Sequence, residues 1–336
     1  MPRVLVVMPG FEDYLSDGVF HGLRTLLGAD AVDFPRADLL YDDVSTADRA
    51  LVRGGGFTLY GLLEDTHVNR WRVLDRAAHG EFDLVIFADI LRNFGPWTQW
   101  APQLHGVVPM AVLDGADRIE PYPYSGVWWR RRVWWTLPRA LGRATYFKRE
   151  ITPWTAWFRS YLLAPPPLGP ALGLLRRLRP IAFCIPEEKI VAGPPIKEKD
   201  FPAHVVDEEL AARIGASTSY AFADERAYYD DLRRSRYGVT VKRAGWDALR
   251  HYEIAASGAV PCFRDLHAKP PLCAPHGLVD GVNCIAYTNA DELQARLAGI
   301  DEAAYAQMQA GALAWARANT TIVRARELLA ACGLSI

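Results

Sequence analysis

The chain has 336 residues, half of them apolar and 23% charged, with a net charge of −1. This length exceeds one typical hydrophobic core and predicts two domains. The near-neutral charge gives no general attraction to nucleic acid, so we expect no nucleic-acid partner.

The cysteines and the N-terminus predict an intracellular protein. The five cysteines are odd in number and lack the spacing of a metal site, which favours reduced thiols and no bound metal. Residues 1–8 lead directly into a strand without the flanks of a signal peptide. No run of about 18 apolar residues is free of charge, so no membrane span is expected. We therefore expect a cytoplasmic protein.

Strands and helices alternate in the first half of the sequence. Apolar periodicity predicts strands at 4–8, 31–34, 82–88 and 107–113, and helices at 17–27 and 71–78. This alternation predicts an α/β fold in which helices cover both faces of a parallel sheet. Ligand groups in such sheets follow the carboxyl ends of the strands, where Asp89, Asp114 and Asp117 stand. Ordinary turn chemistry explains each of these aspartates equally well.

A glycine-rich loop, Arg53–Phe57, interrupts this alternation. It lacks the Gly-Lys-Ser/Thr ending of a phosphate-binding P-loop and the spacing of a dinucleotide fingerprint. We interpret it as a loop near the functional site.

Residues 128–179 form a segment rich in tryptophan and arginine, with Glu150 as its only acid. Six of the eleven tryptophans lie here: Trp128, Trp129, Trp134, Trp135, Trp154 and Trp157. Tryptophan with arginine suits peripheral contact with an anionic membrane surface or a lipid-linked acceptor. The same residues suit stacking on sugars or bases, or a buried segment whose arginines extend over apolar surface. We interpret the segment as an insertion in a first domain spanning residues 1–180.

A second domain, residues 181–310, is predicted to begin with a strand at Ile181–Ile185. Further strands are predicted at 239–243, 259–263 and 283–287, with helices at 225–235, 291–297, 302–319 and 321–332. The last helices, within residues 311–336, are expected to pack back on the first domain.

The stretch 243–263 carries the clearest chemical signal. It reads as a helix followed by a buried strand, with Glu253 in the middle of an otherwise apolar helix and Arg250 one turn earlier. Lys242 and Arg243 precede a helix N-terminus expected at Gly245 and Trp246. Cations and free N–H groups suit the phosphates of a nucleoside diphosphate, and a carboxylate suits a ribose diol. The alternative is an ordinary strand–helix–strand unit with Arg250 and Glu253 as a surface pair.

Four short motifs in this half resemble the donor half of GT-B glycosyltransferases, especially the exostosin-like and related group 1-type enzymes. They are Tyr229–Ser235, Lys242–Asp247, Arg250–Glu253 and Ser257–Pro261. The turn at Gly277–Ile285 extends the resemblance, whereas the first half, including Asp114–Asp117 and Tyr146–Glu150, is similar in a less specific way.

The resemblance implies two Rossmann-like domains facing a cleft, with a nucleotide sugar as co-substrate and neither a metal nor another cofactor. By its motifs, Glu253 matches the carboxylate that holds the donor ribose, and Arg250 matches the arginine before it. Lys242 and Arg243 match the region that contacts phosphates. Retaining members of the wider fold often have two glutamates eight positions apart, the second at the position of Glu253. Gly245 stands at the position of the first, which favours an inverting reaction.

An inverting transfer needs a base for the acceptor hydroxyl. Asp17 and His21 follow the first strand four residues apart and would share a helix face, so we predict them as base and orienting partner. The alternative is a solvated surface pair, and Asp13, Asp89 and Asp114 are further candidates for the base.

The predicted function is therefore transfer of a sugar to an unidentified acceptor, such as a lipid-linked saccharide, a polysaccharide or a small natural product. Two alternatives stay open: a non-catalytic nucleotide-sugar-binding protein of the same fold, and an unrelated Rossmann-type enzyme. The first strand is not followed by a Gly-x-Gly-x-x-Gly turn, which disfavours a dinucleotide enzyme.

Overall fold

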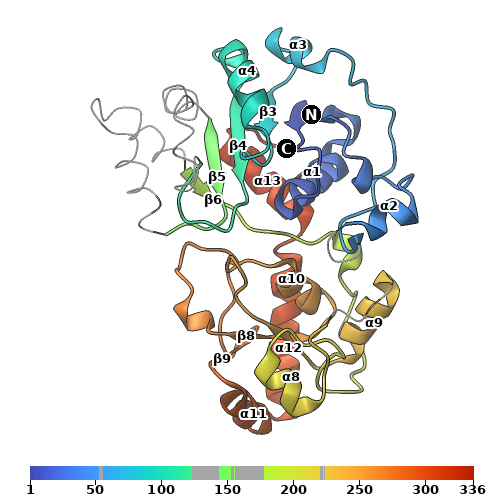
Figure 1. Cartoon of the computed structure of the whole chain (residues 1–336), viewed down its shortest axis with the longest axis vertical. Helices are drawn as coiled ribbons and strands as arrows, with labels where there is room; N and C mark the ends of the chain where they lie inside the picture. Colours follow the sequence, from blue (N-terminus) through green and yellow to red (C-terminus); the bar gives the residue numbers. More distant parts are fainter. Residues whose placement is uncertain (53–55, 123–143, 153–154, 156–177, 220–221, 223) are drawn as a thin grey trace.

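The computed structural model describes residues 1–336 except 53–55, 123–143, 153–154, 156–177, 220–221 and 223. The chain forms two lobes, and both termini lie in the first of them (Figure 1). All six tryptophans of the segment 128–179 lie outside the described residues, so the predicted membrane or acceptor contact of that segment stays a prediction.

A six-stranded parallel sheet forms the centre of the first lobe. Its strands are β1 (Val4–Val7), β2 (Ala31–Phe34), β3 (Leu84–Phe87), β4 (Met110–Asp114), β5 (Thr145–Lys148) and β6 (Leu178–Pro180). They lie in the order β2-β1-β3-β4-β5-β6. The strand order reverses direction between β1 and β3, which creates the crevice where open α/β sheets bind ligands.

Among its described residues, the first lobe has the helices α1 (Tyr14–Leu27), α2 (Thr46–Ala50), α3 (Val73–Ala78) and α4 (Phe94–Leu104). Helix α1 begins earlier than expected, because the Asp13 side chain accepts a hydrogen bond from the Ser16 N–H and caps the first turn. The helix ends at Gly28, whose φ of 55° suits glycine.

The second lobe surrounds a smaller parallel sheet, with the order β7-β8-β9. Its strands are β7 (Tyr237–Thr240), β8 (Val260–Arg264) and β9 (Ile285–Tyr287). Its helices are α8 (Glu208–Ile214), α9 (Glu225–Arg234), α10 (Leu249–Ala256), α11 (Ala290–Ala298) and α12 (Glu302–Arg317). Short 3-10 turns lie at Gly28–Asp30, Asp38–Leu40, Glu187–Lys189 and Leu266–Ala268.

The predicted strand Ile181–Ile185 is wrong, because this segment forms no strand of either sheet and connects the lobes. The Ile181 N–H still donates to the Lys148 carbonyl at the end of β5, and the residues after it bond outside the sheets. The Phe183 N–H donates to Asp247 Oδ2 at 2.7 Å, and Ile185 pairs with the turn at Asn319–Thr321. The apolar residues 181–185 are therefore buried in the connection between the lobes and do not form a strand.

The last helix, α13 (Thr321–Ala331), returns to the first lobe and packs along α1, as predicted (Figure 1). The two helices meet closely at Gly22, where an added Cβ would lie 1.9 Å from the Thr321 carbonyl oxygen. A glycine in the middle of α1 thus permits the contact between the two ends of the chain.

Replacing Gly22 with alanine should therefore lower the free energy of unfolding by about 2 to 3 kcal/mol, since overpacking forces the helices apart. Urea unfolding measures this loss. Gly95→Ala in α4 is the matched control, because a Cβ there meets nothing within 4 Å and should change stability by less than about 1 kcal/mol. Equal effects of the two substitutions would contradict the close packing of α1 on α13.

Candidate functional site

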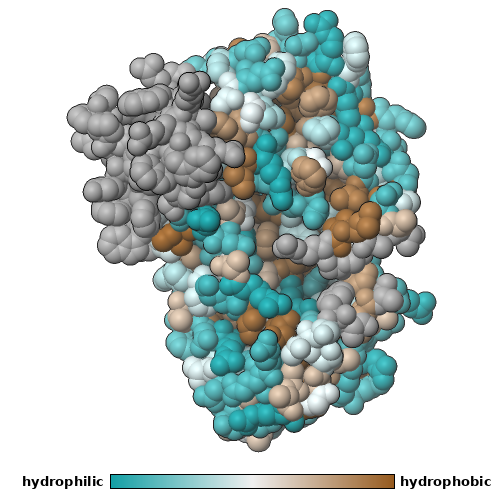
Figure 2. Space-filling model, viewed as in Figure 1, coloured by the Kyte–Doolittle hydropathy of each residue, from teal (hydrophilic) through white to brown (hydrophobic). Residues whose placement is uncertain are grey.

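A cavity of about 750 Å³ lies between the two lobes. Its lining combines residues that follow β1 and β4 of the first lobe with the segment between β7 and α10 of the second. The residues are Glu12, Asp13, Tyr14, Phe57, Arg92, Gly115, Asp117, Arg149, Phe183, Tyr228, Arg243, Ala244, Gly245, Asp247, Ala248, Leu249, Arg250 and Glu253. On the face in Figure 2, hydrophilic residues cover most of the described surface, with apolar residues emerging near the junction of the lobes.

Two arginines give this cavity a positive side. Arg243 and Arg250 both line it, and neither forms an ion pair with any other residue that the structure describes. Arg250 and Glu253 form no surface pair, so the simpler explanation of their spacing does not hold within the described structure. Guanidinium groups without a carboxylate partner are well suited to bind an anion such as a diphosphate.

Lys242 and Trp246 lie outside this lining. Lys242 is exposed, with its Nζ 5.7 Å from the centroid of the Trp246 ring. That ring in turn lies 6.3 Å from the ring of Phe263. The structure thus brings together four of the six predicted donor-site residues, Arg243, Gly245, Arg250 and Glu253.

The helix N-terminus expected at Gly245 and Trp246 is wrong, because α10 begins at Leu249. The buried Asp247 side chain accepts hydrogen bonds from the Phe183 N–H and the Tyr252 hydroxyl. These bonds hold residues 245–248 as a loop. The first turn of α10 still faces the cavity through Leu249 and Arg250, and no side chain caps it.

The carboxylate of Glu150, in the first lobe, accepts hydrogen bonds from two backbone N–H groups of this loop. Glu150 Oε1 accepts from the Trp246 N–H at 2.9 Å and from the Asp247 N–H at 3.4 Å. Arg149 reaches the same loop, donating to the Asp247 carbonyl at 2.8 Å. These contacts join the lobes on one side of the cavity, so the N–H groups left for a ligand are those at the start of α10.

The buried His251 side chain links this loop to β7 by two hydrogen bonds. Its Nε2 lies 2.9 Å from the Trp246 carbonyl oxygen, which can only accept, so Nε2 carries the proton. Its Nδ1 then accepts from the Thr240 hydroxyl at 2.7 Å. Burial lowers the pKa of His251 to about 4, and the imidazole stays neutral near pH 7.

Stability should consequently fall in acid through His251. The unfolded chain takes up a proton near pH 6.5 and the folded chain only near pH 4, so the contribution is complete above pH 6.5 and is lost as the pH falls towards 4. We expect a loss of about 2 to 3 kcal/mol between pH 7 and 4.5 that is absent from His251→Gln. Urea unfolding of both proteins at the two pH values tests this, and identical pH dependence would contradict it.

Glu253 presents a nearly buried carboxylate to the cavity. Its Oε1 accepts from the Thr58 hydroxyl at 2.5 Å and its Oε2 from the Tyr228 hydroxyl at 2.5 Å. Thr58 also lies 2.8 Å from the Tyr229 hydroxyl. Sequence reasoning missed Thr58 and Tyr228 as site residues. The glycine-rich loop before Thr58 and the motif beginning at Tyr229 were the only signals near them.

Asp17 and His21 lie in the core of the first lobe and do not line the cavity. Asp17 Oδ2 accepts from the Asp13 N–H and the Tyr60 hydroxyl, both at 2.9 Å. Burial raises the pKa of Asp17 well above its usual value. His21 is directed elsewhere, towards Thr321 at 2.9 Å and Glu188 at 3.3 Å.

Two other aspartates lie where the strand order reverses. Asp13 lines the cavity after β1, and Asp89 follows β3 in a left-handed conformation with φ of 40°. Burial, together with the nearby Asp13 carboxylate, raises the pKa of Asp89 to about 6. Asp89 forms an ion pair with Arg92 at 2.8 Å, so of these two carboxyl groups only Asp13 lacks an ion pair among the described residues.

The remaining candidate aspartates are engaged by cations. Asp114 is fully buried beside Lys148 at 3.2 Å and accepts from the Tyr146 hydroxyl at 2.5 Å. Asp117 lines the cavity and pairs with Arg149. Of the aspartates that follow strands in the described parts of the first lobe, Asp13 combines cavity exposure with freedom from an ion pair.

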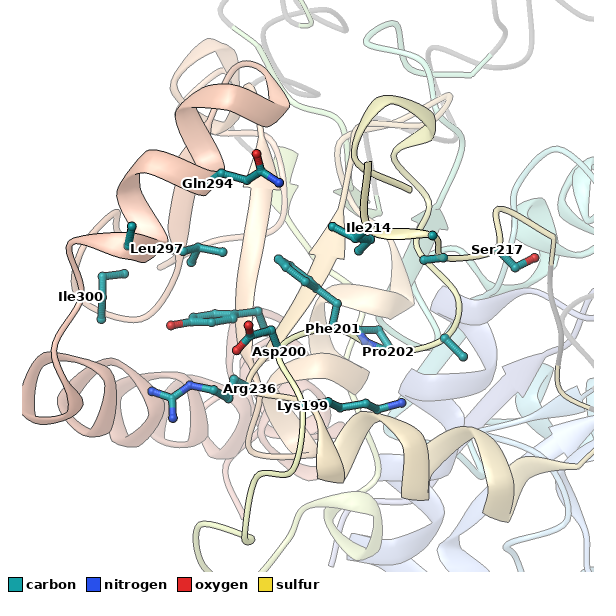
Figure 3. A pocket seen from close by; sticks show the side chains of 15 residues that line it. Lys199, Asp200, Phe201, Pro202, Ile214, Ser217, Arg236, Gln294, Leu297 and Ile300 are labelled. Carbon is teal, nitrogen blue, oxygen red and sulfur yellow. The ribbon is translucent and has the colours of Figure 1, made fainter. Parts of the chain in front are cut away.

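A second hollow, of about 850 Å³, lies in the second lobe and is lined by residues between Lys199 and Ile300 (Figure 3). Its two cations are engaged, Lys199 with Asp231 and Arg236 with Glu302 at 2.9 Å. None of the predicted site residues lines it. Charge and position therefore favour the cavity between the lobes as the functional site.

No helix among the described residues is long and apolar enough to cross a bilayer. Within the same residues, no group of three or more His, Cys, Asp or Glu side chains is arranged to hold a metal ion. The prediction of metal independence stays a prediction.

No protein-family profile and no curated protein sequence matches the chain. Solved structures do. HepE from Anabaena in complex with UDP and glucose matches with a TM-score of 0.54 and 11% identity, over 99% of this chain and 100% of that one. Trehalose-6-phosphate synthase OtsA matches with a TM-score of 0.51 and 12% identity, over 99% of each chain. Sucrose-phosphate synthase from Thermosynechococcus elongatus matches with a TM-score of 0.51 and 10% identity, over 98% of each chain.

These neighbours are GT-B glycosyltransferases, and the similarity extends over nearly the full length of the chain. The predicted fold, two Rossmann-like domains facing a cleft, is confirmed.

Proposed function

We propose that the chain is a glycosyltransferase that binds a nucleoside diphosphate sugar in the cavity between its lobes and transfers the sugar to an acceptor. The observation that carries this proposal is a set of three suitable groups that line the cavity from α10 and the loop before it. Arg243 and Arg250 lack ion-pair partners among the described residues, and Glu253 lies one turn further along α10. The HepE structures with UDP and with UDP-glucose support a nucleotide sugar as the ligand class.

The proposed reaction depends on stabilising the negative charge of the leaving diphosphate. Breaking the bond between the sugar and the diphosphate leaves negative charge on the phosphate oxygens. Two guanidinium groups and the free N–H groups at the start of α10 stabilise that charge where it develops. Glu253 holds the ribose by accepting its hydroxyl hydrogens. We assign the chain to the exostosin-like and group 1-type enzymes on its motifs, with no metal in the reaction.

We favour an inverting reaction, for which the surroundings of Gly245 give a physical reason. A Cβ at this position would lie 2.5 Å from both Asp117 Oδ1 and Glu150 Oε1. A glutamate side chain there would meet two carboxylates at once. A glutamate at this position, which matches the first glutamate of retaining relatives, would therefore have to displace the carboxylates of Asp117 and Glu150.

Asp13 is the best-placed base. Its Oδ1 caps α1 through Ser16, and its Oδ2 lies on the side of Gly115 at the crevice. The acceptor oxygen would form a bond to the anomeric carbon as the diphosphate leaves, and its proton would pass to Asp13. In this scheme Asp17, our first candidate for the base, acts through Asp13 by accepting its N–H, and His21 stabilises the contact with α13.

Calorimetric titration with UDP, GDP, ADP and dTDP tests the donor site. We expect at least one of them to bind, and Glu253→Ala to weaken that binding about tenfold or more, since hydrogen bonds to a charged group are lost. Glu208→Ala, on the exposed start of α8, is the control and should bind as the unmodified protein does. The proposal fails if none binds or if Glu253→Ala changes nothing. Binding without any transfer would favour a non-catalytic nucleotide-sugar-binding protein.

A further inference from the structure

Thr58 has an unusual backbone for its residue type. Its φ is 75°, in the left-handed region that β-branched residues rarely adopt, and its side chain is fully buried. Such strain persists only where surrounding contacts hold it, and it concentrates at clamps and switch regions. The contacts that hold Thr58 come from the other lobe.

Three polar groups of the second lobe engage Thr58. Its N–H donates to Glu225 Oε1 at 2.7 Å, and its hydroxyl contacts both Glu253 and Tyr229. The preceding residue, Phe57, stacks on Tyr228 with ring centroids 6.0 Å apart. The loop Gly56–Thr58 therefore joins the lobes on the side of the cavity where Glu253 lies.

Glu225 anchors this contact with cations from outside α9. Lys189 donates to its Oε1 at 2.6 Å, and Arg49 donates to its Oε2 at 3.3 Å. The amide bond from Thr58 thus ends on a carboxylate that is already fixed.

The Thr58 hydroxyl uses the same carboxylate that the donor ribose needs. A ribose diol presents two hydroxyl donors, and a carboxylate receives them on its two oxygens. In this structure Oε1 of Glu253 accepts from Thr58 and Oε2 from Tyr228. Each oxygen therefore already accepts one hydroxyl, and a ribose hydroxyl bound at Oε1 would compete with that of Thr58.

We propose that Thr58 is a positioning residue that substitutes for a ribose hydroxyl on Glu253 and is displaced when the donor enters. Displacement releases the strained Gly56–Thr58 loop from the second lobe, so the first lobe responds to donor occupancy through this loop. The proposal deepens the proposed function and rests on it, because it takes Glu253 as the ribose ligand.

The affinity for UDP tests whether the Thr58 hydroxyl competes with a ribose hydroxyl for Glu253. Thr58→Val keeps the β-branched shape and removes the hydroxyl, so we expect it to bind UDP about tenfold more tightly. Thr58→Ser keeps the hydroxyl and should bind like the unmodified protein. In a background of Glu253→Gln, Thr58→Val should no longer tighten UDP binding, since the two residues share the hydrogen bond that is tested.

Amide hydrogen exchange provides a second measurement on the unmodified protein. Saturation with UDP should speed exchange at the Thr58 N–H at least severalfold, because its bond to Glu225 opens. UDP binding with slower or unchanged exchange there, or with no gain in Thr58→Val, would overturn the displacement alone. Absence of nucleotide binding in every variant would overturn the proposed function as well.

Discussion

Replacing Asp13 with asparagine should lower the rate of sugar transfer about a thousandfold while leaving UDP affinity within about twofold, as expected when a general base is removed. Asparagine caps helices as well as aspartate does, so α1 should keep its N-terminus through Ser16. The loss would then reflect proton transfer and not a change in fold. Release of UDP from UDP-glucose, with water as the acceptor, is the measurement.

Asp17→Asn separates the two candidates for the base. If Asp13 is the base, Asp17→Asn should reduce turnover by much less, since it alters a neighbour that accepts the Asp13 N–H. A complete loss in Asp17→Asn with activity retained in Asp13→Asn would return the base to Asp17. That result would require the buried Asp17 to reach the acceptor.

Removing Arg243 and Arg250, the cavity arginines without an ion pair among the described residues, should strongly weaken nucleotide binding. We expect Arg243→Met and Arg250→Met each to weaken UDP binding about tenfold and the double variant about a hundredfold, because charge-assisted hydrogen bonds to the diphosphate are lost. The effect should shrink as salt is raised, since the site is partly open to solvent.

Lys242→Met is the matched control, because Lys242 is adjacent in sequence yet exposed outside the cavity lining. Its substitution should change UDP affinity by about twofold at most, which is typical of an exposed charge. A large effect of Lys242→Met with little effect of the arginine substitutions would show that the phosphates lie on the other side of the loop.

The sequence was informative where one element carries the chemistry. Arg243, Arg250 and Glu253 lie within one loop and the helix that follows it, so local spacing alone brings them to one side of the cavity. The alternating strands likewise predicted the parallel sheet. The return of the last helix to the first domain was also predicted, although its partner, α1, was not.

Sequence reasoning failed where distant segments determine the local structure. The start of α10 was misplaced because Asp247 is held by Phe183, which lies in the connection between the lobes. The same connection was mistaken for a strand. Thr58 reaches Glu253 across 195 residues, and no local pattern reports such a contact. Propensity and periodicity describe neighbours in the chain, whereas these bonds depend on how the lobes meet.

The structure of the chain with bound UDP tests the central claim most directly. We expect the ribose hydroxyls within hydrogen-bond distance of the Glu253 carboxylate, and the diphosphate against Arg243, Arg250 and the first N–H groups of α10. UDP bound in the hollow of the second lobe between Lys199 and Ile300, or in the interlobe cavity without contact to Glu253, would contradict the account.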